Sequence, residues 1–132
     1  MVFVVVFFLT GLVLLRSCKE TIETRYRTLA EVKRAGALER GWLPPVLPAS
    51  AVDIQESNDL DFNVGSGGFS FDPAELSGYL TTLRDQLSAT TVEAEAFWDV
   101  SFAKENTRWS LRLPKNGRQA TYEVKLVSPS VP

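Results

Sequence analysis

The last third of the chain alternates apolar and polar side chains, and this pattern constrains the fold more than any other feature. Residues 96–102, 107–113 and 120–126 each place apolar side chains at every second position. A period of two is that of a β-strand buried on one face. The connection between the second and third runs contains Asn116-Gly117, a strong hairpin signal because both residues tolerate a positive φ. The three runs therefore predict an antiparallel meander with an apolar inner face and a charged outer face.

The first half of the chain predicts three further strands. Residues 21–27 alternate in the same way, and residues 51–56 also have the pattern of a strand. A polar stretch at 57–63 turns the chain, and residues 67–71 return as a strand. The glycines at the start of this last segment are expected to weaken its near end.

Two segments predict helices. Thr28 and Glu31 form a capping box for a short helix that ends near Gly36 or Gly41. Asp72, Pro73 and Glu75 begin a second helix over residues 73–87, with leucines along one stripe. Both helices have an apolar side that can pack on a sheet.

The two helices are separated by a proline-rich segment at residues 41–48. Its three prolines cannot continue a helix, because each lacks an amide donor and has a fixed φ. We expect an extended connector anchored by Trp42, Leu43 and Leu47.

The predicted fold class is therefore α+β, an antiparallel sheet packed by two helices in the order β-α-β-β-α-β-β-β. An N-terminal apolar anchor or signal helix precedes it. Residues 18–127 are expected to form one α+β domain, and residues 128–132 a frayed tail.

The N-terminus carries a run of 14 uncharged residues at positions 2–15. As a helix it would be about 21 Å long, which is short for a bilayer core of about 30 Å. Its length matches the apolar region of a signal peptide. We predict that residues 1–17 are a signal or membrane anchor, so that residues 2–15 contact the membrane.

The fate of this segment is left open by the residues after it. Leu15-Arg16-Ser17-Cys18 resembles a bacterial lipoprotein cleavage box, in which the cysteine receives the lipid. Arg16, however, stands where a small residue is usual, so Cys18 is either lipidated or follows an uncleaved anchor. Arg16 and Lys19 would favour a cytoplasmic flank, whereas a secretory signal would export the domain.

Composition excludes several kinds of site. The chain has no histidine, which removes Ser-His-Asp, Cys-His and His-metal sites, and its one cysteine cannot form an intrachain disulfide. Its 14 basic and 16 acidic residues give a net charge of −2, unlike a nucleic-acid binder. The glycines at 65–68 lack the Gly-Lys-Ser/Thr ending of a phosphate-binding loop. We predict no cofactor, no metal, no nucleotide and no nucleic-acid partner.

Charge is distributed unevenly along the chain. Residues 41–83 contain six acids and no base, whereas residues 104–127 contain six bases and two acids. Either an acidic turn faces a basic hairpin, or a dipolar surface steers a charged partner. The candidate binding residues are Trp42, Asp53, Glu56, Asp59, Asp61, Arg108, Arg112 and Arg118.

The acidic turn has two chemical alternatives. Asp59, Asp61 and Asn63 alternate as in a calcium loop, but Val64 stands where such a loop needs glycine and Ser70 where it needs glutamate. This favours a polar β-turn. Acid pairs such as Asp53 with Glu56, or Asp59 with Asp61, could hydrolyse a glycoside if their carboxyl groups converged.

A set of residues within about positions 24–75 carries a family resemblance: Tyr26-Arg27-Thr28, Glu31, Gly41-Trp42-Leu43-Pro44, Leu47-Pro48, Ala51, Asp53-Ile54, Glu56, Asp59 and Asp61. With this motif the segment resembles small bacterial proteins that have an N-terminal signal or anchor, and it is similar to the domain called the YbbD head. Phe62-Asn63 departs from the usual Thr-Asn. The resemblance implies an exported, anchored domain with no assigned activity, and transfers no catalytic residue.

Three functions are consistent with these features. The first is a membrane-anchored binding or interaction domain on the extracytoplasmic side, with a possible protein partner and no chemistry of its own. The second is a hydrolase that uses carboxylates, with or without a divalent ion. The third is an accessory subunit of a membrane complex.

Overall fold

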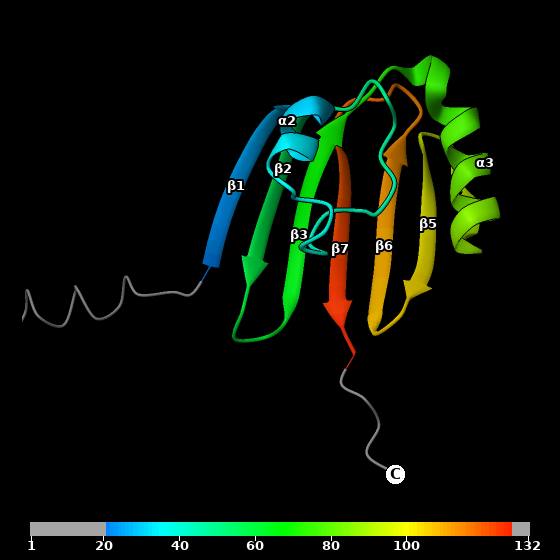
Figure 1. Cartoon of the computed structure of the whole chain (residues 1–132). Helices are drawn as coiled ribbons and strands as arrows, with labels where there is room; N and C mark the ends of the chain where they lie inside the picture. The colour runs from blue at the N-terminus through cyan, green and yellow to red at the C-terminus, as the bar shows by residue number, and fades with distance from the viewer. Residues whose placement is uncertain (1–20, 128–132) are drawn as a thin grey trace, which may run out of the picture.

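A computed structural model describes residues 21–127, which contain a seven-stranded antiparallel sheet (Figure 1). The strand order is β1-β2-β3-β7-β6-β5-β4, so the last hairpin, β6–β7, sits in the middle of the sheet beside β3. The strands are β1 (Thr21–Thr28), β2 (Val52–Asp59), β3 (Val64–Ser70), β4 (Thr90–Glu93), β5 (Phe97–Lys104), β6 (Thr107–Pro114) and β7 (Ala120–Leu126).

One face of the sheet is covered by two helical elements and the connector. Helix α2 (Leu29–Arg34) follows β1, and α3 (Leu76–Leu87) follows a 3₁₀ turn, η1 (Pro73–Glu75). The segment at residues 35–51 lies across β1, β2, β3 and β7, while α3 lies beside β5 (Figure 1). Their apolar side chains join one core with those of the strands.

The expected α+β class, with two helices packing the sheet in the order β-α-β-β-α-β-β-β, is wrong. The structure is dominated by the sheet, and α2 has six residues, so α3 is the longer of two unequal helices. The physical reason is that Gly36 adopts a left-handed φ of 65° soon after α2. The first helix therefore ends near Gly36, as expected, and irregular chain rather than helix covers this part of the sheet.

The predicted order also lacks one strand, β4. Its four residues are too few to show a clear alternation, and it forms by pairing Thr90–Glu93 with β5. The other expected strands are confirmed within a few residues, as is the Thr28 cap, whose hydroxyl accepts from the Glu31 amide at 3.3 Å. The connector is anchored as predicted, with Leu43 and Leu47 buried and Trp42 half-buried.

The glycines of β3 lie inside the strand, not at a weakened end. A Cβ at Gly67 would lie 1.9 Å from the Gln55 carbonyl oxygen and 2.7 Å from the Tyr122 hydroxyl. A Cβ at Gly65 would lie 2.8 Å from the ring of Trp42. The glycines therefore make room for two aromatic rings, and those rings supply the packing that β3 itself lacks.

Several predictions fall outside the described residues: the anchor at 1–17, Cys18 and the tail at 128–132. Among the helices of residues 21–127, none has the length and apolar character needed to span a bilayer.

Candidate functional site

The two faces of the sheet are very different. On the covered face, the central strands present buried aromatic and aliphatic side chains such as Phe69, Tyr122 and Trp109. On the other face, the residues between them are mostly exposed and polar. The strand registers align these polar residues in rows that cross the sheet. One row contains Glu23, Ser57, Ser66, Glu123, Ser110, Ser101 and Thr90.

The uncovered face is concave, with a cavity volume of about 810 Å³. Its lining reaches from β1 to β4 and so includes side chains from all seven strands. Four serines and two threonines project into it, where their hydroxyls can both donate and accept hydrogen bonds. We call this surface the hydroxyl face, and its central residues are Ser57, Ser66, Ser101, Ser110, Thr90 and Thr121.

Arg112 is a charged residue of the hydroxyl face that makes both hydrogen bonds and a ring contact. Its guanidinium donates two hydrogen bonds to the Asp99 carboxylate, at 2.9 and 3.1 Å. It also lies over the Phe97 ring, 4.0 Å from the centroid. Asp99 raises the pKa of Arg112, chiefly by hydrogen bonding. The hydrogen-bonded Arg112–Asp99 pair thus places two charged groups beside the row of hydroxyls, as expected for a surface that recognises polar groups.

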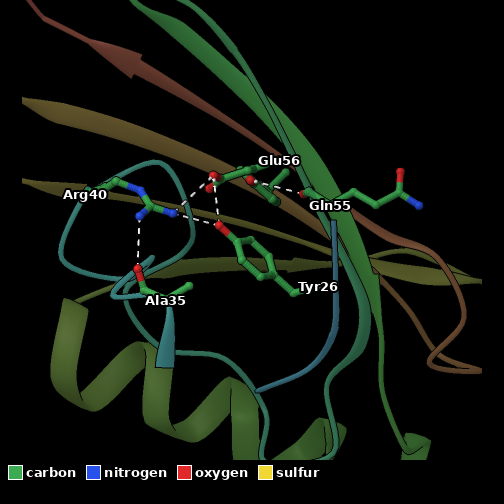
Figure 2. A network of polar contacts seen from close by, with 6 residues as sticks. Tyr26, Ala35, Arg40, Gln55 and Glu56 are labelled. Atoms are coloured by element: carbon green, nitrogen blue, oxygen red, sulfur yellow. Dashed lines mark hydrogen bonds and ion pairs between the residues drawn. The ribbon is translucent and has the colours of Figure 1, made fainter. Parts of the chain in front are cut away.

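A polar cluster lies on the covered side of β1 and β2 (Figure 2). Its centre is Glu56, whose side chain is 3% exposed. The Tyr26 hydroxyl lies 3.4 Å from Glu56 Oε1, and Arg40 Nη2 lies 3.9 Å from the same oxygen. Arg40 also donates to the Tyr26 hydroxyl at 2.7 Å and to the Ala35 carbonyl at 3.0 Å. The cluster thus ties the chain after α2 to the first two strands.

Burial raises the pKa of Glu56 above its ordinary value of 4.5, while Arg40 and the Tyr26 hydrogen bond offset part of this. The second carboxyl oxygen, Oε2, and the nearby Asn58 Oδ1 are buried without a hydrogen-bond partner among residues 21–127. Glu56 is therefore an internal group and not the surface contact that the sequence suggested.

The other predicted binding residues are scattered. Asp53 is exposed at the start of β2, in an irregularity of the β1–β2–β3 pairing, with a φ of 50°. Asp59 and Asp61 lie at the opposite end of β2. Arg118 is exposed in the β6–β7 turn, near the end where Asp53 lies. The β6–β7 turn with Arg118 therefore lies at the opposite end of the sheet from the acidic turn, whereas the registers bring Arg108 and Lys125 of the same hairpin near Asp59.

Arg108 and Arg112 are both exposed on β6, on the uncovered side of the sheet. Arg112 belongs to the hydroxyl face, whereas Arg108 lies nearer the acidic turn and pairs in register with Lys125. Trp42 packs against Gly65 on the covered side. Of the eight candidates, the structure places Glu56 and Arg112 along the same lining, but the Glu56 carboxylate points into the core.

The acidic turn is a polar β-turn held by Asp59. Its Oδ1 accepts the amides of Asp61 and Phe62 at 3.1 and 3.3 Å. Among residues 21–127, no group of three or more acidic or cysteine side chains is placed so that it could hold a metal ion. The Asp53–Glu56 pair is not assembled, since one group is exposed and the other is internal.

The hydroxyl face was missed by sequence reasoning. The alternating pattern predicted a charged outer face, and its serines and threonines belong to no recognisable motif. The signal that could have found it is the recurrence of serine or threonine at the outward positions of six strands, β2 to β7, which only the register converts into rows.

Residues 20–70 match the family model of the YbbD head domain. The expected resemblance is confirmed over that part of the chain, which covers β1, α2, the connector, β2 and β3. Comparison with curated proteins and with solved structures found no match. The YbbD head match indicates a small domain and identifies no ligand or reaction.

Proposed function

We propose that this protein is a membrane-tethered interaction domain that binds a protein partner on its hydroxyl face. The observation that carries the proposal is that one side of a seven-stranded sheet is concave and uncovered, while the other is fully packed. A protein has to bury one sheet face to fold, but nothing about folding requires the other to be hollow. The hydroxyl face is therefore the surface best placed to receive another molecule.

The composition of the hydroxyl face supports a protein partner. Pockets for small organic ligands are usually lined mainly by apolar and aromatic side chains. The hydroxyl face instead mixes serines and threonines with Glu23, Arg25 and Glu123. Reversible protein interfaces are about as polar as ordinary surface and use direct and water-mediated hydrogen bonds. The Arg112–Asp99 pair would give such an interface a fixed orientation.

The tether is residues 2–15, and we place the domain on the extracytoplasmic side of the membrane. The apolar run supports the tether, and the similarity to anchored bacterial proteins supports export. Lipidated Cys18 and an uncleaved anchor are both compatible with this proposal.

Site-specific photo-crosslinking in native membranes tests the binding surface. A photoreactive residue would replace Ser110 at the centre of the hydroxyl face, and Thr81, exposed on α3, would serve as the matched control. We expect a discrete protein adduct from position 110 that is absent at position 81 and lost in the Arg112→Glu variant. Identical adduct patterns at both positions would contradict the proposal.

The tether is tested by intact mass and by carbonate extraction of the same membranes. We expect the full chain to stay in the pellet after extraction at high pH. A mass that begins at an acylated Cys18 would identify a lipoprotein, and a retained Met1 would identify an uncleaved anchor. Recovery in the soluble fraction with neither feature would contradict the tether.

A further inference from the structure

Exposed apolar side chains gather at one end of the sheet. Five of the seven large hydrophobic residues that are exposed in residues 21–127 lie there, and Phe62 is the most exposed, at 75%. The set is Ile22, Leu60, Phe62, Leu126 and Val127, which we call the apolar end.

Backbone contacts hold the apolar end together. Ile22 pairs in register with Asn58, just before the turn that carries Leu60 and Phe62. The Leu126 amide donates to the backbone carbonyl of Asn63 at 3.0 Å, and the Val127 amide donates to the backbone carbonyl of Asn106 at 2.7 Å. The Asp59 carboxylate fixes the turn by accepting two of its amides. Phe62 is therefore presented at the tip of a turn with a defined shape.

The apolar end is also where the described chain begins. β1 starts at Thr21, and five residues separate Thr21 from the last residue of the apolar run, Leu15. Even fully extended, that link reaches about 20 Å. If Cys18 carries the lipid instead, the link is about 10 Å. Under either form of the tether, the apolar end lies closer to the lipid than the opposite end of the sheet does.

We propose that the apolar end docks on the bilayer surface, with Leu60 and Phe62 inserted among the lipid headgroups and upper acyl chains. This inference rests on the proposed tether and specifies how the domain sits on it. The strand axes extend from the apolar end to the opposite end of the sheet. Docking would therefore point these axes away from the bilayer surface and leave the hydroxyl face open to a partner.

Charges around the apolar end favour apolar docking over electrostatic docking. Three bases, Lys104, Arg108 and Lys125, lie within the same part of the sheet as three acids, Asp59, Asp61 and Glu105. Their charges balance, so attraction to anionic headgroups is not required. Burial of apolar surface supplies the driving force, and the contact is expected to form on zwitterionic lipid and to persist in high salt.

Tryptophan quenching by brominated lipid tests this placement. The full-length variants Phe62→Trp and Leu60→Trp would be reconstituted in phosphatidylcholine vesicles with and without bromine on the upper acyl chain. The unsubstituted chain corrects for its native tryptophans. The matched control is Val92→Trp, at a position that is 61% exposed on β4, away from the apolar end.

We expect bromine to quench most of the emission added by F62W and L60W, with or without high salt, and to leave that added by V92W unchanged. Equal, weak quenching of all three variants on a chain that stays with the vesicles would overturn docking while leaving the tether intact. A chain that leaves the vesicles would overturn both. A blue shift of F62W that grows with protein concentration and is insensitive to bromine would make a second copy the occupant and overturn the lipid assignment.

Discussion

The two faces of this sheet are built from the same strands, yet they contribute to the protein in different ways. The covered face carries rings and branched chains, and at Gly65 and Gly67 of β3 the rings of Trp42 and Tyr122 leave no room for a Cβ. The hydroxyl face carries short side chains that touch few neighbours and leave a hollow. Successive side chains of a strand point to opposite faces of the sheet, so neighbouring residues belong to different faces.

This difference separates the residues that maintain the fold from those available for binding. A change on the covered face removes contacts that no other group replaces, whereas a change on the hydroxyl face removes only solvated groups. The buried Glu56 cluster belongs to the first set despite its charge. Substitutions on one face should therefore change the free energy of unfolding much more than substitutions on the other.

The largest effect is expected for Gly67→Ala. The added Cβ would overlap the Gln55 carbonyl oxygen, so β2 and β3 would have to separate. We expect the free energy of unfolding to fall by about 3 kcal/mol, measured by urea denaturation of the full chain in detergent. The control is Gly78→Ala on α3, where a Cβ meets nothing within 4 Å. It should stabilise the protein by up to about 1 kcal/mol. Similar losses for both variants would show that β3 tolerates side chains.

The next effect compares two adjacent residues of β6. Leu111 is 2% exposed on the covered face, and Ser110 is exposed on the hydroxyl face. Leu111→Ala should lower the free energy of unfolding by about 3 kcal/mol, because it removes buried apolar surface and leaves a cavity. Ser110→Ala should change the unfolding free energy by less than about 0.5 kcal/mol. A large loss for Ser110→Ala in the same denaturation assay would mean that the hydroxyl face also maintains the fold.

A smaller effect is expected for the buried phenols. The Tyr122 hydroxyl donates to the Gln55 carbonyl at 3.3 Å, and the Tyr79 hydroxyl donates to the Val46 carbonyl at 2.7 Å. Removing either hydroxyl, in Tyr122→Phe or Tyr79→Phe, should lower the free energy of unfolding by about 1 kcal/mol, because a buried carbonyl loses its donor. Tyr79→Phe should also increase amide hydrogen exchange in the connector, whereas Tyr122→Phe should not. Unchanged unfolding free energies in both variants would show that these carbonyls find water instead.

The smallest effect concerns the pH dependence of stability. Because folding raises the pKa of Glu56, its ionisation costs more in the folded state than in the unfolded state. The contribution of this group is therefore most favourable below its unfolded pKa, and it is lost as pH rises through the raised folded pKa. Glu56→Gln should remove this component, so its stability relative to the unsubstituted chain should increase as pH rises from about 4. A difference that is constant with pH would contradict the assignment.

Much of the fold could be predicted because its signals are local. The alternation at 107–113 and 120–126, the Asp72 cap and the prolines of the connector each act within a few residues. The second helix was predicted from its leucines, and Leu80 and Leu83 are indeed buried. The α+β class was wrong because the share of the sheet face that helices cover and the pairing of β4 with β5 depend on distant parts of the chain.

The candidate site was harder to predict because it depends on which residues of different strands lie side by side. Acidic residues that are close in sequence, such as Asp53 and Asp59, lie at opposite ends of one strand. Serines far apart in sequence, such as Ser66 and Ser101, lie in one row. Charge can be read from the sequence, but proximity across a sheet depends on register.

By itself, the sequence determined which residues alternate, where helices begin and where the chain is uncharged, because each of these depends on near neighbours. Only the tertiary structure decided that Glu56 is internal, that glycines accommodate Trp42 and Tyr122, and that exposed hydrophobic residues meet at one end of the sheet. Strand order and register bring together residues that are tens of positions apart, and no local pattern encodes that pairing.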